Sequence, residues 1–299
     1  MEVSQDFSRQ ARDLRVGTWA AILSYGMWGL FPVYWKQIDH VDTVQILCHR
    51  IFWSTIFLFI VLRAHGLTRQ IIPIFRHKKS LMAVAICAIL ITANWGTYIW
   101  AVNVGRVTES SLGYYITPLL SVALGSVFFN EKMDRWTVTA LILSVLGVAA
   151  ATSMIGKLPW VAIVLAITFS VYGAVKKWAG LDAMTGLAAE TIVVAPFAVA
   201  WLIWTNHTDW GNFFGPDIKS AIFLTVAGPV TAIPLLTFAY AAVRIPLQRI
   251  GFIQYFSPTV QLLIGILLYR ERLSTPMTLA FANVLAAVAL YLGTRKRLF

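Results

Sequence analysis

Two charged side chains lie inside long apolar segments of this sequence. Arg50 is the only Asp, Glu, Lys or Arg within residues 44–62, and Glu190 is the only one within residues 184–204. A charge at the centre of a membrane-spanning helix costs about 2.5–3.5 kcal/mol on insertion scales, so a charge retained there is a candidate for function. A guanidinium in that position can clamp an anionic group, and a carboxylate can carry a proton. We therefore consider anion binding at Arg50 and proton coupling at Glu190.

Both charges also have a structural interpretation. Glu109, at the start of the apolar segment 110–129, is expected at a depth similar to that of Arg50 and could form an ion pair that pins two helices. Alternatively, the long side chain of Arg50 could reach toward the interface. Glu190 could pair with Lys176 or Lys177, at the end of segment 159–175. The sequence leaves these alternatives open.

Uncharged polar and aromatic residues near the middle of the apolar segments could complete a binding cavity. Asn94 and Tyr98 are four residues apart and share a helix face. Pro118 and Pro258 each remove a backbone hydrogen bond and are predicted to interrupt their helices. The predicted cavity residues are Trp28, Arg50, Asn94, Tyr98, Tyr115, Tyr172, Gln254 and Tyr255. Among them, Trp28, Tyr98, Tyr115, Tyr172 and Tyr255 would form an aromatic wall around a small amphipathic molecule, unless they serve only helix packing.

The composition requires a membrane to surround these residues. Of 299 residues, 59% are hydrophobic and only 12% are charged, more apolar surface than a soluble core of this size could bury. Uncharged runs of about 18 to 24 residues match a hydrocarbon core of about 30 Å. The sequence therefore predicts an all-α membrane protein with ten spans. Their predicted ranges are 17–38, 44–62, 80–103, 110–129, 136–154, 159–175, 184–204, 219–243, 248–268 and 276–293.

The chain also contains an internal repeat. The tract 113–132 returns as 253–272, with Tyr115 matching Tyr255 and Pro118 matching Pro258 at the same offset of 140 residues. We therefore divide the chain into a tail (1–16), a first five-helix repeat (17–154), a second five-helix repeat (159–294) and a basic tail (295–299). Because five is odd, the second repeat is predicted to be inverted, an architecture typical of transporters with a site near the midplane.

The positive charges predict the orientation of the chain. With a cytoplasmic N-terminus, most of the 24 lysines and arginines fall in cytoplasmic segments, including the basic residues of both tails. Both termini are thus expected in the cytoplasm, with the protein in the inner membrane.

Other activities find little support in the sequence. It contains no phosphate-cradling Gly-rich loop, metal-ligand His pair, nucleophile elbow or Cys pair. We therefore expect no enzyme activity, no cofactor and no metal. The net charge of +11 reflects membrane topology rather than nucleic-acid binding. The expected partners are a small-molecule substrate and the lipid bilayer, and no oligomer is required.

Several short motifs are similar to those of a known family. The motifs are residues 27–32, 34–36, 49–50, 53–54, 94–95, 100–103, 105–106, 109–114, 227–232, 254–255 and 257–259. They resemble the RarD subfamily of EamA-type transporters, within the drug/metabolite transporter superfamily. The resemblance implies ten helices in two inverted five-helix units around a central cavity, and many members of the superfamily export amino acids or related metabolites. Thr117 departs from the pattern, which has Asn before this proline.

Together these observations predict a secondary transporter. We expect export of a small amphipathic metabolite by alternating access, with a cavity lined by spans one, three, four, six, eight and nine. The alternatives are efflux of hydrophobic drugs, uptake of a metabolite, or a membrane receptor or scaffold without turnover.

Overall fold

The computed structural model describes residues 2–130, 133, 135–180, 182–206, 213, 215–242, 244–245 and 253–294, and within these residues the regular structure is entirely helical. The first half contains α1 (Glu2–Gly29), α2 (Phe31–Trp35), a 3₁₀ turn (Lys36–Ile38), α3 (Thr43–Ala64), a 3₁₀ turn (Thr68–Gln70), α4 (Ile71–Arg76), α5 (Lys78–Asn103), α6 (Val107–Phe129) and α7 (Arg135–Ile155). The second half contains α8 (Trp160–Ala179), α9 (Ala183–Asn206), α10 (Ile218–Ala242), α12 (Phe256–Leu263), a π-helical turn (Ile264–Leu268) and α13 (Thr275–Thr294).

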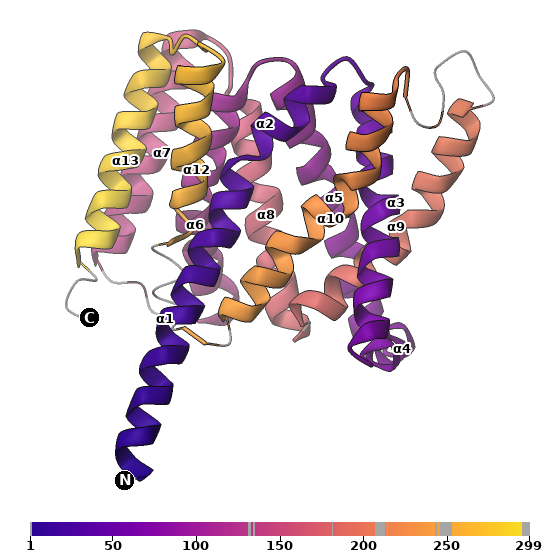
Figure 1. The fold of residues 1–299 in the computed structure, drawn as a ribbon. Coiled ribbons are helices and arrows are strands. Elements are labelled where there is room, and N and C mark those ends of the chain that lie inside the picture. The colour runs from indigo at the N-terminus through magenta and orange to yellow at the C-terminus, as the bar shows by residue number, and fades with distance from the viewer. Residues whose placement is uncertain are drawn as a thin grey trace.

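Seven of the described helices are long and apolar enough to cross a membrane: α3, α5, α6, α7, α8, α9 and α10. Two shorter apolar helical segments follow, Phe256–Leu268 and Thr275–Leu290. The N-terminal end of α1 and the C-terminal end of α13 lie toward the same end of the bundle, and α4 lies at that end on the opposite edge (Figure 1). Residues 248–252 of the ninth predicted span and the predicted tail 295–299 lie outside the described residues.

Several helices begin where a side chain accepts hydrogen bonds from their first backbone N–H groups. Asp42 Oδ1 accepts from the N–H groups of Val44 (2.9 Å) and Gln45 (3.1 Å), and starts α3. Asp217 Oδ1 accepts from the N–H of Ser220 (2.8 Å) near the start of α10, and this bond lowers the pKa of the exposed Asp217 carboxyl. Such caps replace the intrahelical partners that these N–H groups lack, so they set the depth at which each helix begins.

The first predicted span differs from the structure. We expected one helix over residues 17–38, but α1 runs from Glu2 through the predicted tail to Gly29, and α2 starts anew at Phe31. The break lies beside Pro32, whose missing N–H leaves the carbonyl of Trp28 without its helical donor. Gln261 of α12 supplies a donor instead, with its Nε2 atom 3.2 Å from that carbonyl oxygen. A side chain of the second half therefore completes the broken helix of the first.

The two halves are interlocked. Helix α1 packs against α10 and α12 of the other half, and α8 packs against α5 and α6. At the sequence offset of the repeat, α8 corresponds to α1, while α10 and α12 correspond to α5 and α6. The pairs α3–α10 and α9–α5 correspond in the same way. Helices α7 and α13 pack together at one side of the bundle (Figure 1).

Helix α10 lies against the backbone of α3 at Gly228. A Cβ atom added there would lie 2.4 Å from the carbonyl carbon and oxygen of Trp53 and 2.8 Å from the nitrogen of Ser54. Because these neighbours are backbone atoms of a helix, they cannot move aside as a flexible side chain would. Gly228 thus permits the contact that brings α10 against the helix carrying Arg50.

Replacing Gly228 by alanine is expected to destabilise the protein by about 1–3 kcal/mol, because the added methyl group overpacks this contact. The thermal unfolding of purified Gly228→Ala in detergent measures this effect. Gly173→Ala in α8 is the matched control, since no described atom beyond the adjoining backbone of α8 lies within 4 Å of its added Cβ. Equal unfolding temperatures for the two variants would contradict the close contact at Gly228.

Candidate functional site

Arg50 lies on α3 and is buried, with 3% of its surface exposed. Its guanidinium carbon is 4.0 Å from the centre of the Trp95 ring, 5.2 Å from that of Trp35 and 5.6 Å from that of Phe31. Trp95 belongs to α5, and the other two rings belong to α2. The aromatic faces attract the cation, and their contribution grows when water is excluded. Arg50 is therefore held as a charge in an aromatic surround.

A single hydrogen bond within the described residues holds the guanidinium. Arg50 Nε donates to Oγ1 of Thr231 on α10, at 3.0 Å. The buried Nη1 atom has no partner among the described residues, and the same holds for the buried Tyr98 hydroxyl and Trp35 Nε1. These three groups belong to adjoining residues of one aromatic surround and can all donate hydrogen bonds. Buried polar atoms without partners are costly and call for a ligand or a functional explanation.

The expected ion pair between Arg50 and Glu109 is wrong, and so is the interpretation in which Arg50 reaches the interface. Glu109 forms an ion pair with Arg106, whose Nε atom is 2.7 Å from Oε2 of Glu109. The other oxygen accepts from the backbone N–H of Val161 at the start of α8, at 3.1 Å. Because Arg106 lies one turn before Glu109 on the same side of the chain, it reaches the carboxylate without crossing between helices. Glu109 thus connects the start of α6 with the start of α8, and whether it serves coupling or structure stays a prediction.

A second carboxylate joins the halves in the same region. Glu271, which follows the π-helical turn, accepts from the N–H groups of Val107 (2.7 Å) and Thr108 (2.8 Å) at the start of α6. An acidic side chain at a helix N-terminus satisfies free donors and opposes the positive end of the helix dipole. The sequence analysis did not select this residue, although the repeat pairs it with Glu131 of the first half.

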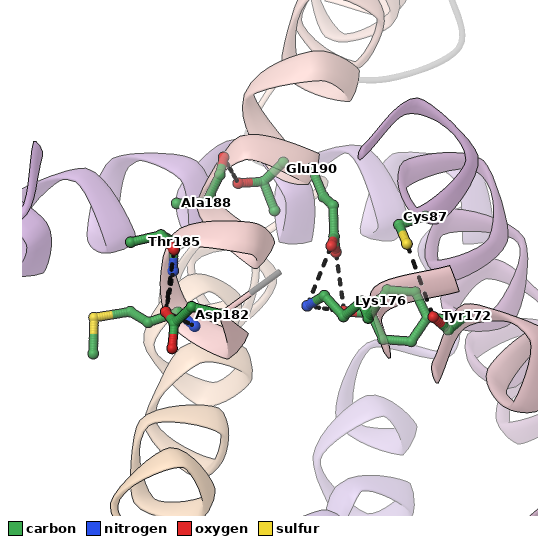
Figure 2. Close-up of polar contacts among 9 residues, drawn as sticks. Cys87, Tyr172, Lys176, Asp182, Thr185, Ala188 and Glu190 are labelled. Carbon is green, nitrogen blue, oxygen red and sulfur yellow. Dashed lines mark hydrogen bonds and ion pairs between the residues drawn. The ribbon is translucent and has the colours of Figure 1, made fainter. Parts of the chain in front are cut away.

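Glu190 lies in a second polar cluster, at α8 and α9, and is fully buried (Figure 2). Lys176 Nζ is 3.2 Å from Oε1 of Glu190, and the Tyr172 hydroxyl donates to Oε2 at 3.0 Å. The same lysine donates to the Tyr172 hydroxyl at 2.6 Å. The expected pairing of Glu190 is thereby confirmed for Lys176, whereas Lys177 Nζ lies 4.6 Å from the centre of the Phe129 ring. A role of Glu190 in proton coupling stays a prediction.

Asn94, a predicted cavity residue, has hydrogen-bond partners at both ends of its amide. Its Nδ2 atom donates to the carbonyl of Leu165 (3.1 Å) and to Oγ1 of Thr168 (2.9 Å). Its Oδ1 atom accepts from the Tyr114 hydroxyl at 3.3 Å. The side chain therefore ties α5 to α8 and α6. Tyr98, one turn later on α5, belongs to the same buried cluster as Phe31 and Trp35, and its ring centre lies 5.8 Å from that of Tyr114.

The remaining predicted cavity residues fall in other groups. Tyr115 and Tyr255 stack with ring centres 6.0 Å apart, and the Tyr115 hydroxyl lies 2.6 Å from Oγ1 of Thr259. Trp28 contacts the ring of Tyr25 at 5.1 Å. Gln254 is half-buried in the turn before α12.

The predicted aromatic wall is divided among three packed clusters. Trp28 and Tyr98 belong to the cluster around Trp35, Tyr172 to the cluster between α3, α5 and α9, and Tyr115 with Tyr255 to the cluster between α6, α12 and α13. Pro118 lies inside α6, which remains a single helix, and Pro258 lies near the start of α12. Of the predicted set, the structure brings together Arg50 and Tyr98, and separately Tyr172 and Glu190.

Sequence reasoning missed four residues that surround Arg50: Phe31, Trp35, Trp95 and Thr231. Each lies in one of the short motifs that resemble the known family, at residues 27–32, 34–36, 94–95 and 227–232. Phe, Trp and Thr are common in apolar helices, so their residue types alone did not distinguish them. The usable signal was that these motifs belong to the same set as motif 49–50, which contains Arg50.

A bundle of membrane-length apolar helices that buries an arginine without a carboxylate partner among the described residues is typical of a polytopic membrane protein with an internal polar site. The chain belongs to the EamA-like transporter family, whose model matches residues 15–153 and 158–293. It is therefore a multi-pass membrane transporter of the inner membrane.

Individual relatives agree with this assignment. The chain is 38% identical over 285 residues to the uncharacterized transporter YojE of Bacillus subtilis (strain 168), covering 94% of this chain and 95% of the relative. It is 36% identical over 279 residues to the protein RarD of Streptomyces exfoliatus, covering 92% and 88%. These similarities confirm the resemblance to the RarD subfamily. A solved crystal structure has a TM-score of 0.60 at 16% identity, covering 92% of this chain and 96% of the other, and shows the fold alone.

Proposed function

We propose that the protein is a secondary transporter that exports a small amphipathic metabolite, an amino acid or a related compound, by alternating access. The observation that carries this proposal is the buried Arg50, whose Nη1 atom has no partner among the described residues. Its one hydrogen bond crosses from α3 of the first half to α10 of the second. A substrate bound at Arg50 would therefore lie where a relative movement of the halves changes its surroundings.

The energetics of the site support a ligand with a negative charge. An arginine inside the membrane costs about 2.5–3.5 kcal/mol on insertion scales, and the stacking on Trp95 returns on the order of 1–2 kcal/mol. An anionic group could satisfy the remaining donors through charge-assisted hydrogen bonds, which are about twice as strong as neutral ones. Arg50 is only 3% exposed, so such a ligand can enter only when the helices around it separate.

The helix pairing supports alternating access. Helix α1 of the first half packs against α10 and α12 of the second. Its counterpart in the repeat, α8, packs against α5 and α6 of the first half, which are the counterparts of α10 and α12. Ten spans in two inverted units would relate the two contact sets by a pseudo-two-fold axis in the membrane plane, so that one set opens as the other closes. In this proposal both termini are cytoplasmic, and the export direction follows from the family resemblance.

Hydrophobic drug efflux, metabolite uptake and a receptor role are the competing functions. The test begins with thermal unfolding of the purified protein against amino acids, nucleobases and aromatic drugs, since a ligand at 100 times its Kd stabilises the folded state by about 2.7 kcal/mol. The stabilising compound is then followed by counterflow in proteoliposomes. We expect an amino acid or related compound to stabilise the protein and to exchange.

Each other outcome identifies a competitor. Stabilisation by neutral aromatic drugs alone would favour drug efflux, and stabilisation without counterflow would favour a receptor or scaffold. Net flux measured with the gradient imposed in each direction, on vesicles of defined protein orientation, separates export from uptake.

A further inference from the structure

The segment 227–232 of α10 brings a hydroxyl group to the guanidinium of Arg50. Gly228 allows α10 to touch the backbone of α3 at Trp53 and Ser54, close to Arg50 in the sequence. Thr231, three residues after Gly228 and 1% exposed, receives the hydrogen bond from Arg50 Nε at 3.0 Å. This motif is thus the only part of the described second half that hydrogen-bonds to Arg50.

Two contacts together orient the guanidinium plane. The guanidinium carbon lies over the Trp95 ring, 4.0 Å from its centre, and Thr231 holds the Nε edge. A planar fork that contacts a ring and is held at one edge can turn little, so the direction of its remaining donors is restricted. Those donors include Nη1, which is buried and has no partner among the described residues.

We infer that Thr231 is a positioning residue, which aims Arg50 Nη1 at the carboxylate of the transported compound, with the Tyr98 hydroxyl as a second donor. This inference rests on the proposed transport function and names the group recognised at its site. A carboxylate is planar, carries two acceptor oxygens and matches the fork of an arginine that already contacts a ring. A carboxamide of the same shape replaces one acceptor oxygen by an NH₂ donor and lacks the charge, so it is expected to bind poorly.

The experiment compares ligands that differ only in this group. The full-length protein in detergent is titrated with benzoate and benzamide, and with L-phenylalanine and L-phenylalaninamide, and Kd is obtained from the shift in thermal unfolding. For the wild type, we expect at least one carboxylate to stabilise the protein. Its amide should bind with at least tenfold weaker affinity, because it loses a hydrogen bond between charged groups.

The variants isolate the hydroxyl group of residue 231. Thr231→Val has nearly the same shape without a hydroxyl and is expected to weaken carboxylate binding by about tenfold. The unfolding temperature without ligand should also fall by a few degrees, because Arg50 Nε loses its partner. Thr231→Ser keeps the hydroxyl and should bind within about threefold of wild type. Thr237→Val is the matched control on the same helix, because the one hydrogen bond of its hydroxyl to a described residue stays within that helix, at the carbonyl of Ile233.

A double variant tests whether Thr231 acts through Arg50. Adding Thr231→Val to Arg50→Gln should produce no further loss of carboxylate affinity, because the group being positioned is already absent. If Thr231→Val does not fold, Thr231→Ala replaces it in every comparison.

Two results with the variants would overturn the inference: unchanged carboxylate affinity in Thr231→Val, or equal losses of carboxylate affinity in Thr231→Val and Thr231→Ser. Two results with the wild type would also overturn it: equal affinity for an acid and its amide, or no binding of either carboxylate. Failure of the transport function has a different signature. In that case the carboxylate binds in a Thr231-dependent manner, but the wild-type protein shows no counterflow of it in proteoliposomes.

Discussion

Arg50→Gln is expected to reduce affinity for the transported anion by at least about 100-fold and to abolish its counterflow, because glutamine lacks the charge that pairs with the ligand. At the same time, the unfolding temperature without ligand should stay within a few degrees of wild type or rise. The guanidinium has one hydrogen bond and no ion pair among the described residues. Removing a buried charge that lacks a counter-charge relieves a desolvation cost.

Thr231, the hydrogen-bond partner that Arg50→Gln releases, is another reason to expect an unchanged unfolding temperature. Once the guanidinium is gone, the hydroxyl of Thr231 can bond to a carbonyl one turn earlier on its own helix, as threonines commonly do. Several other threonines of this chain make that bond, for example Thr55 to the carbonyl of Ile51 at 2.8 Å. No new unpaired group therefore needs to remain on α10.

Two further variants test whether binding depends on the guanidinium of Arg50 in particular. Arg50→Lys keeps the charge but loses the planar fork, so we expect weak residual binding. Arg63→Gln, in the exposed last turn of α3, is the matched control and should leave binding unchanged. A large fall in unfolding temperature for Arg50→Gln, with affinity retained in the remaining folded protein, would establish a structural role instead.

Lys176→Met is expected to destabilise the protein by about 3–5 kcal/mol, since it leaves the buried carboxylate of Glu190 without its counter-charge. The reverse change, Glu190→Leu, should cost less. Lys176 keeps 15% of its side chain exposed whereas Glu190 is fully buried, so a solitary lysine can extend toward the interface and a solitary glutamate cannot. The combined variant Lys176→Met/Glu190→Leu should recover much of the loss, because paired apolar side chains can replace a buried ion pair.

Thermal unfolding in detergent measures all three variants, with Lys177→Met as the control at the neighbouring, exposed lysine. Equal losses of stability for the two single variants would contradict the asymmetry.

Transport assays separate an effect on stability from an effect on proton coupling. If Glu190 carries the coupled proton, Glu190→Gln loses transport driven by a pH gradient but retains counterflow. If the cluster only joins α8 to α9, the two activities change together.

The apolar segments determined most of the helices without reference to tertiary structure. Runs of membrane length are predicted as helices because an apolar environment leaves backbone groups no partner except the helix itself. The predicted ranges 44–62 and 80–103 therefore lie within α3 and α5. The first span was one exception, because the break beside Pro32 is completed by Gln261, a residue distant in sequence. The ninth was another, since among the described residues of 248–268 the continuous helix starts only at Phe256 and gives way to a π-helical turn at Ile264.

The sequence by itself placed Arg50 and Glu190 within apolar segments, and it placed Lys176 among the possible partners of Glu190. Only the tertiary structure decided that Arg50 contacts Trp95, Trp35 and Thr231 rather than Glu109. The reason is geometric. Residue spacing gives the depth of a side chain along its helix, but its partner depends on the rotation of that helix and on which helices lie beside it. These follow from close contacts such as that of Gly228 with the backbone of α3, which form only when the two halves pack together.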